Sequence, residues 1–312
     1  MKCSFVLLAA KKLFFLLLLV TVVLTVTTCA SLTKSQLQRV TNLTVASDTV
    51  IATPKAIFNE LAAVRLERGL YYAASLTSAV AREKEINALA TASIADEQLV
   101  GRAEGYVNVL NSYLRALRSI SATTRWQAYG TEWRGIGRNI DSLLLRFNQT
   151  ELIDTQIPVG WAKLSGQYAG YMSERFMRMR QAKIVRSFVT EGDTLVATCT
   201  SGLIEILKQG DLIDLIENES QGLKNNYEAY LHRLELSGMP ADFEADRKYI
   251  ALVKRIEAAK KSRSRCVTAL QSLRRAHAKL VQELEKKQNI EFLIDELIEL
   301  NTLALSLQNM LE

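Results

Sequence analysis

Apolar residues recur every three or four positions along most of the chain, which is the spacing of one face of an α-helix. The most regular series begins at Trp126 and reaches Phe147 in alternating steps of three and four. A similar stripe upstream consists of Tyr106, Val109, Leu110, Tyr113, Leu117 and Ile120. Both stripes predict long helices that pack lengthwise against neighbours. Because no stretch shows the sustained alternation of a half-buried strand, we predict an all-α fold.

Proline and glycine residues indicate where these helices begin and end. Thr53 followed by Pro54 has the form of an N-cap and a first helical residue. Pro158 and Gly160 predict the main break near the middle of the chain. Further turns are expected at Gly192, Gly210 and Ser237–Pro240, and two last helices are expected over 241–287 and from Ile290 onward. We therefore predict about seven mostly long antiparallel helices, in an elongated bundle or two connected bundles.

The N-terminal segment differs from the rest of the chain. An uncharged apolar run over 13–26 follows three lysines and precedes small residues, which is the order of a secretory signal,. The run ends in the sequence VTTC at Cys29. This segment resembles the signal of bacterial lipoproteins, whose cysteine is acylated and becomes the mature N-terminus. The resemblance covers the signal only. It implies a lipid anchor at Cys29, and Ala30 after it implies the periplasmic side of the outer membrane in a Gram-negative host.

Two other interpretations of this segment stay open. Ordinary signal cleavage after Ala30 would leave no lipid. Retention as an uncleaved anchor needs about 17 to 25 apolar residues. The run here reaches that length only if Lys11 and Lys12 extend their side chains to the interface.

These signals divide the chain into four parts, of which the first is the lipoprotein-type signal peptide. The parts are 1–28, the signal; 29–52, a tether with a short helix; 53–157, a first helical bundle; and 158–312, a second bundle with the long C-terminal helix.

Charge changes the picture in two ways. The whole chain has 39 Lys+Arg and 33 Asp+Glu, but three lysines lie in the signal, so the mature chain carries 36 bases, 33 acids and a net charge of +3. That balance, and the lack of aromatic residues over 255–287 that could stack on bases, argue against a nucleic-acid partner. The segments 191–222 and 289–312 carry net charges of −6 and −5, whereas 243–288 carries +8. We expect the acidic segments to pack against the basic helix.

Cysteine and histidine residues lie on apolar helix faces. Cys266, Leu270, Leu273, His277, Leu280 and Leu284 form one heptad series, and Cys199 has apolar helical neighbours. Cys199 and Cys266 could form a disulfide in an oxidising envelope, or both could be buried thiols. A lone histidine on such a face favours a hydrogen-bonded core residue over a metal ligand, since metal sites need several convergent ligands.

Aromatic residues concentrate around the central break. Trp126, Tyr129, Trp133, Trp161, Tyr168 and Tyr171 fall on two consecutive predicted helices. They form either a bulky core or the lining of a cavity for an apolar or ring-bearing ligand.

The functional expectation rests on location and on missing motifs. The sequence contains no phosphate-binding glycine loop, nucleophile elbow, zinc-protease motif or C-x-x-C pair,. We therefore expect no catalytic residues, no metal and no cofactor. We expect a membrane-tethered structural or protein-interaction module of the cell envelope that binds a protein partner or itself. The alternative is a ligand-binding or sensor domain that uses the aromatic pocket.

Overall fold

The computed structural model describes residues 32–91, 97–122, 129–149, 160–161, 174–285 and 293–311. Within them the chain forms eight α-helices and no strand, which confirms the all-α prediction. The helices are α2 (Lys34–Ser75), α3 (Ala79–Thr91), α4 (Glu97–Ser121), α5 (Tyr129–Gln149), α7 (Glu174–Lys208), α8 (Gly210–Leu236), α9 (Phe243–Glu285) and α10 (Ile294–Leu311).

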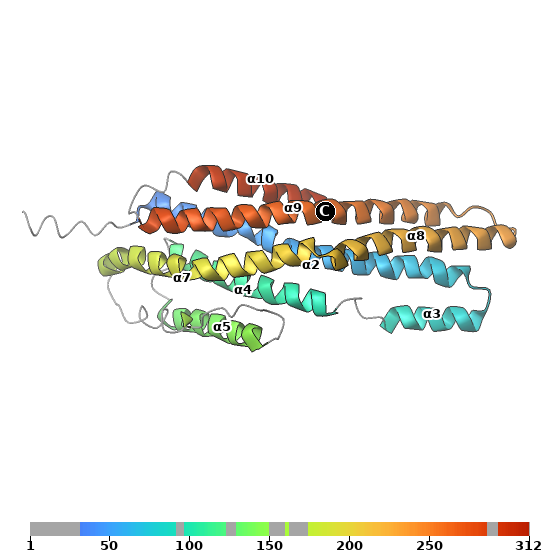
Figure 1. The fold of residues 1–312 in the computed structure, drawn as a ribbon, viewed down its shortest axis with the longest axis horizontal. Coiled ribbons are helices and arrows are strands. Elements are labelled where there is room, and N and C mark those ends of the chain that lie inside the picture. The colour runs from blue at the N-terminus through green and yellow to red at the C-terminus, as the bar shows by residue number, and fades with distance from the viewer. Residues whose placement is uncertain are drawn as a thin grey trace, which may run out of the picture.

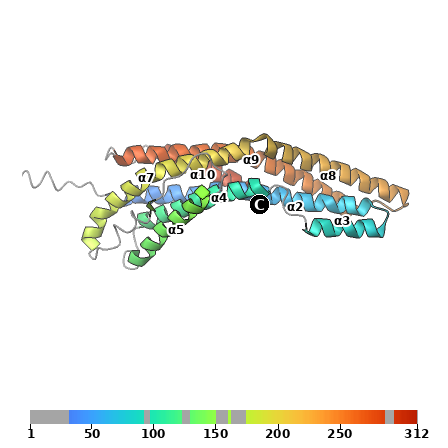
Figure 2. The same ribbon diagram turned by 60° about the horizontal axis from the view of Figure 1, so that its bottom comes forward.

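The helices lie side by side in an elongated rod (Figures 1 and 2). Helix α2 has 42 residues and α9 has 43, so each is about 64 Å long at 1.5 Å per residue,. We call the end where α2 begins the proximal end. The distal end holds the turn after α2, at 76–78, and the loop between α8 and α9, at 237–242. Helices α3 and α4 run back from the distal end, α7 and α8 run out again, α9 returns, and α10 covers only the proximal half.

One hydrophobic core runs through the rod. In the proximal half α2, α4, α7 and α9 pack together, α10 lies on α2 and α9, and α5 lies on α4. In the distal half α2, α8 and α9 pack together, and α3 lies on α2. The buried apolar residues of both halves form one continuous cluster. Of the two arrangements left open by the sequence, the described helices adopt the elongated bundle, and the expected division at residue 53 falls inside α2.

The start of α2 corrects the prediction at Thr53 and Pro54. The helix begins at Lys34, where Thr33 forms a capping box: its hydroxyl accepts from Gln36 N–H at 3.2 Å, and the Gln36 side chain accepts from Thr33 N–H at 2.8 Å,. Pro54 lies inside the helix instead of at its start. Thr53 does not cap a helix there, because its hydroxyl donates to the Thr49 carbonyl one turn earlier, at 2.8 Å.

The predicted turns differ in outcome. Gly238 ends α8 with a left-handed φ of 62°, and the Met239 N–H donates to the Leu234 carbonyl at 3.0 Å,. Gly210 begins α8 directly after α7. The prediction of a turn at Gly192 is wrong, because this residue lies inside α7. A Cβ atom there would come closer than 3.0 Å to the Tyr113 ring, so Gly192 allows α4 to approach.

The two stripes that the structure describes are buried as predicted. Every member of the series Tyr106, Val109, Leu110, Tyr113, Leu117 and Ile120 lies in the core, as does every member of the series from Cys266 to Leu284.

Both described cysteines are free thiols, which corrects the disulfide considered for Cys199 and Cys266. The register of α7 on α9 explains why. Asp193 lies opposite His277, so Cys199, six residues along α7, lies opposite residue 271 on the antiparallel α9. Cys266 is five residues further, about 7 Å along the axis at 1.5 Å per residue. That offset adds to the lateral separation of the helices and exceeds what a disulfide spans. Cys266 instead donates to the Val50 carbonyl at 3.8 Å.

The prediction that the acidic segments pack against the basic helix is confirmed for both segments. It did not include the acids of α2, which also pair with α9. Helix α9 pairs with α8 through Lys260 and Glu217 at 2.8 Å and with α10 through Arg275 and Glu299 at 2.7 Å. It also pairs with two acids of α2, through Arg255 with Glu60 and Lys248 with Glu67. Such exposed pairs contribute little stability each but favour one register.

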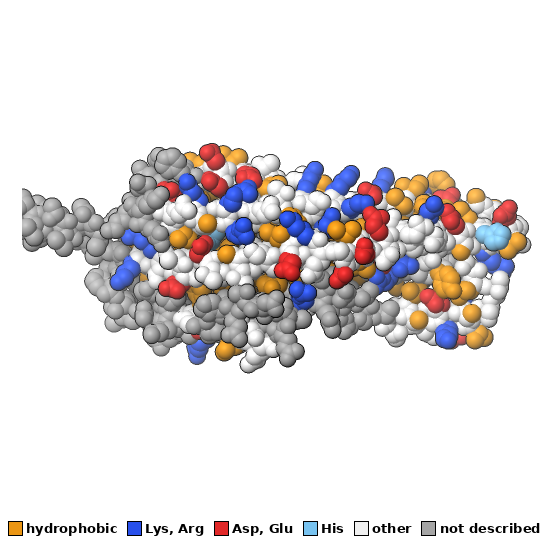
Figure 3. All heavy atoms as spheres, in the orientation of Figure 1, with side chains coloured by type: hydrophobic (Ala, Val, Ile, Leu, Met, Phe, Trp, Pro, Cys, Tyr) orange, Lys and Arg blue, Asp and Glu red, His pale blue; other side chains and the backbone are white. Residues whose placement is uncertain are grey.

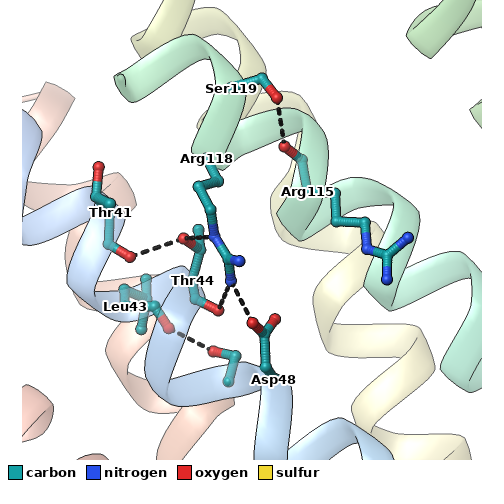
Figure 4. A network of polar contacts seen from close by, with 8 residues as sticks. Thr41, Leu43, Thr44, Asp48, Arg115, Arg118 and Ser119 are labelled. Carbon is teal, nitrogen blue, oxygen red and sulfur yellow. Dashed lines mark hydrogen bonds and ion pairs between the residues drawn. The ribbon is translucent and has the colours of Figure 1, made fainter. Parts of the chain in front are cut away.

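Polar contacts also join α2 to α4 in the proximal half (Figure 4). Arg118 of α4 crosses to α2, where it donates to the Thr44 carbonyl at 2.7 Å and contacts Asp48 at 2.6 Å. Its Nε donates to the Thr44 hydroxyl at 3.1 Å. Because Thr44 is fully buried, this arginine satisfies a polar group that water does not reach,.

Candidate interaction site at the distal end

Four tyrosines from three helices meet near the distal end. Tyr71 comes from α2, Tyr227 and Tyr230 from α8, and Tyr249 from α9. The rings of Tyr227 and Tyr249 stack with centroids 4.0 Å apart, and Tyr71 meets Tyr227 edge-on at 5.3 Å. We call these residues the tyrosine cluster.

Three hydroxyls of the tyrosine cluster hold the N-cap and first turn of α9. Tyr230 donates to Asp242 at 2.7 Å, Tyr227 donates to Asp246, and Tyr71 donates to the Ala245 carbonyl at 2.8 Å. Asp242 also accepts from the Ala245 N–H at 3.1 Å, which is the contact of a helix N-cap,. The cluster therefore positions the α8–α9 hairpin on α2.

Burial and neighbouring carboxylates shift the titration of these groups. Burial, then the charge of Glu67, raises the pKa of Tyr71 to about 12. Burial, then the hydrogen bond to Asp242, raises the pKa of Tyr230 to about 12. The same bond from Tyr230, followed by that from the Ala245 N–H, lowers the pKa of Asp242. At neutral pH Tyr71 and Tyr230 are thus neutral donors and Asp242 is an anion.

A pocket of about 580 Å³ lies in the groove between α2 and α9 beside this cluster. Its apolar lining consists of Leu70, Ala74, Ala245, Ala251 and the tyrosine rings of 71 and 230. Its polar lining includes the ion pair between Lys248 and Glu67, at 2.5 Å, and that between Arg247 and Glu244, at 3.3 Å. We call this region the distal groove. It combines a mostly apolar floor with charged rims, as partner-binding surfaces do.

Large apolar side chains are exposed around the same end. Phe243 is 70% exposed and Leu236 is 68% exposed, both beside the α8–α9 loop, and Val80 after the α2–α3 turn is 76% exposed. Helix α3 has no buried residue. Figure 3 shows apolar side chains gathered at this end of the rod. These exposures make the distal end a candidate interaction surface,.

Part of the tyrosine cluster could have been found from the sequence. A hairpin at Gly238 brings together residues equally distant from it, and Tyr227 and Tyr249 lie eleven residues before and after that glycine. That Tyr71 joins these residues could not have been predicted from the sequence, because it depends on how α2 packs on this hairpin.

The predicted aromatic site falls mostly outside the described residues. Trp126, Tyr168 and Tyr171 lie outside them, as do the side chains of Tyr129 and Trp133. Trp161 is buried, and its ring meets the rings of Tyr113 and Phe188 edge-on at 5.6 and 4.8 Å. The backbone N–H groups of Trp161 and Gly160 both donate to the Asp141 carboxylate, at 2.8 and 2.9 Å. The one member whose side chain is described therefore packs in the core.

His277 is a fully buried residue with two hydrogen-bond partners. Its Nε2 lies 2.7 Å from the Tyr113 hydroxyl, and its Nδ1 lies 3.1 Å from an Asp193 oxygen. The bond from His277 lowers the pKa of Asp193, and burial raises that of Tyr113. The arrangement matches an imidazole that donates to Asp193 and accepts from Tyr113. The bonds from Tyr113 through His277 to Asp193 join α4, α9 and α7, and the rings of Trp161 and Phe188 pack against Tyr113 at the buried end.

A buried carboxylate lies in the middle of the rod. Glu219 of α8 is fully buried, and its two oxygens accept from Arg65 at 2.6 Å and from Arg68 at 2.5 Å, both on α2. Asn226 also donates to the Arg68 carbonyl at 2.9 Å. Two arginines on one buried acid fix the register of α8 against α2, and both guanidiniums are about one-quarter exposed.

Metal and membrane features were sought within the described ranges. There, no group of three or more side chains could hold a metal ion. None of the described helices has the length and apolar character needed to cross a bilayer.

No family model, no curated protein and no solved structure matches the chain. The distal groove and the tyrosine cluster are therefore interpreted from their own geometry.

Proposed function

We propose that this protein is a lipid-tethered helical rod of the bacterial cell envelope, whose distal end binds a protein partner without catalysis. The observation that carries the proposal is the separation of two features along the rod. The anchor implied at Cys29 belongs to the proximal end, and the three most exposed large apolar side chains and the distal groove belong to the other end.

The length of the rod supports this division. Four residues separate Cys29 from Lys34, and they span at most about 14 Å when extended,. A lipid on Cys29 would therefore keep the start of α2 near the membrane surface. The distal end of α2 lies about 63 Å away along the helix, from its 42 residues at 1.5 Å each,. A rod of this kind presents its binding surface at a distance from the membrane that holds it.

Site-specific photo-crosslinking in cells tests the proposal. A photoreactive residue replaces Phe243 at the distal end, and the matched control replaces Val45, which is also exposed and apolar but lies in the proximal half of α2. We expect protein adducts from position 243 and few from position 45. Adducts from neither position, or equal adducts from both, would contradict the proposal.

One observation favours a second candidate function, that of a small-molecule sensor. The distal groove holds a pocket of about 580 Å³ with two tyrosine rings in its lining, within the size range of ligand pockets,. A Leu70→Trp substitution would fill that pocket. If the protein senses a ligand, metabolite extracts should raise the melting temperature of the unsubstituted protein and leave that of the variant unchanged.

A further inference from the structure

The face of the rod that carries α10 has a step at its middle. Helix α10 lies in the groove between α2 and α9 and ends beside Ser262, whose hydroxyl contacts Met310 at 3.7 Å. From Ser262 to the distal end the same groove continues as the distal groove. Figure 1 shows α9 extending beyond the end of α10. The face therefore has a raised half, formed by α10, and a lowered half of bare α2 and α9.

The lowered half continues the surface on which α10 lies. Under α10, α9 presents small buried residues that include Ser262, Ala269 and Ala276, spaced by seven and therefore on one face,. Toward the distal end Ala258 and Ala251 follow Ser262 at steps of four and seven on the same face. Small residues in this pattern allow a helix to lie close to α9. The α2 wall adds Leu70, which is 40% exposed.

The raised half presents an apolar ridge. On α10, Ile298 and Leu305 are 59% and 61% exposed, seven residues apart, while Leu297, Leu300 and Leu307 face the core. Residues 294–311 contain three acids and no base, whereas residues 243–260 of α9 contain five bases and three acids. Four of those five bases already form ion pairs within the chain, with Glu244, Glu67, Glu60 and Glu217, so charge adds little to the apolar contact,.

The two halves also match in length. Helix α10 has 18 residues, and the part of α9 beyond Ser262, residues 243–261, has 19. At 1.5 Å per residue both are about 28 Å long.

We infer that this stepped face binds a second copy of the chain, antiparallel and face to face. A twofold axis across the rod at the end of α10 would set the raised half of each copy into the lowered half of the other. Each contact would then occur twice, as in an isologous dimer. The inference goes beyond the proposed function and does not depend on the lipid at Cys29, because an antiparallel pair holds the two proximal ends apart and would lie along a membrane that held both.

The register of this dimer follows from the position of the axis. Ile298 lies thirteen residues before Leu311, or about 20 Å from the axis,. The same distance beyond Ser262 on the partner reaches residue 249, between Lys248 and Ala251 in the lining of the distal groove. The Ile298 side chain of one copy therefore meets the pocket of the other. A face about 55 Å long and one helix diameter wide covers about 600 Å² per copy, at the lower end of stable interfaces.

The test uses the full chain in mild detergent, prepared as an equal mixture of isotopically light and heavy protein. A photoreactive residue replaces Ile298, and the control replaces Ile213 on α8, which is 38% exposed and lies on another helix of the rod. We expect light–heavy crosslinks from position 298 to peptides of α2 and α9 in the distal groove, and none from position 213. We also expect a dimer by sedimentation, weakened at least about tenfold by Ile298→Glu and unchanged by Ile213→Glu.

Each outcome separates this inference from the proposed function. Light–heavy crosslinks that join α10 to α10, or that arise equally from position 213, would overturn the stepped dimer. A monomer with no light–heavy crosslinks would also overturn it, while adducts to another protein at position 243 would leave the proposed function standing. If Ile298→Glu fails to fold, Leu70→Glu serves as the second variant, because Leu70 lies on the opposite side of the same contact.

Discussion

Gly192 provides a stability test of how α4 packs on α7. In an exposed helix, Gly→Ala stabilises by about 1 kcal/mol. At Gly192 the new Cβ would lie closer than 3.0 Å to the ring and hydroxyl of Tyr113. That ring stacks on Phe188 at 5.3 Å and is bonded to His277 at 2.7 Å, so it cannot move without loss. Overpacking costs about 1–3 kcal/mol, and an unpaired buried polar group costs about 1–3 more. After the propensity gain, we expect Gly192→Ala to destabilise by about 3 kcal/mol.

Urea unfolding followed by circular dichroism measures this difference. The matched control is Gly101→Ala in α4, where a Cβ would meet nothing within 4 Å. We expect the control to gain stability, by up to about 1 kcal/mol. If Gly192→Ala were as stable as Gly101→Ala, the close approach of α4 and α7 and the position of Tyr113 would both be refuted.

Three further predictions concern buried polar groups. Glu219→Gln removes the charge shared by two arginines and should lower the free energy of unfolding in urea by about 2–3 kcal/mol. This is less than the loss on breaking a fully buried ion pair, because the arginines are partly exposed. The control, Glu235→Gln at an exposed position, should change the free energy of unfolding little. Tyr113→Phe leaves His277 Nε2 without its donor and should cost about 1–3 kcal/mol by the same assay. The folded-state pKa of Tyr71 is raised from 10.0 to about 12, so its contribution to the free energy of unfolding is complete below pH 10. That contribution should fall as the pH rises from 10 to 12, and the dependence of the free energy of unfolding on pH in this range should be weaker in Tyr71→Phe.

The helices themselves could be predicted from periodicity, because burial on one face forces the spacing of three and four. The series that contains Tyr113 and the series that contains His277 are buried as expected. The proline and glycine residues expected to mark helix ends were less reliable. Pro54 and Gly192 are signals for helix ends in isolation, yet both lie inside helices where packing outweighs the local preference. The capping box at Thr33 was present in the sequence and shows the true start of α2.

Contacts between helices could not be predicted, because they depend on register. The heptad pattern places Cys199 and Cys266 inward but does not set them at one level along the rod, and they lie about five residues apart in register. Opposite charge indicated that α9 meets acidic helices, but the acids of α2 are interspersed with bases and gave no net signal. The distal groove depends on where α10 ends against α9, which only the assembled bundle shows.

The proposed role depends most directly on how the mature chain is held at the membrane. The decisive measurement is mass spectrometry of the N-terminal peptide from protein purified out of the membrane fraction. We expect a peptide that begins at Cys29 and carries acyl chains. A peptide that still begins at Met1, from protein found in the soluble cytosolic fraction, would contradict the tether and with it the assignment of a proximal and a distal end.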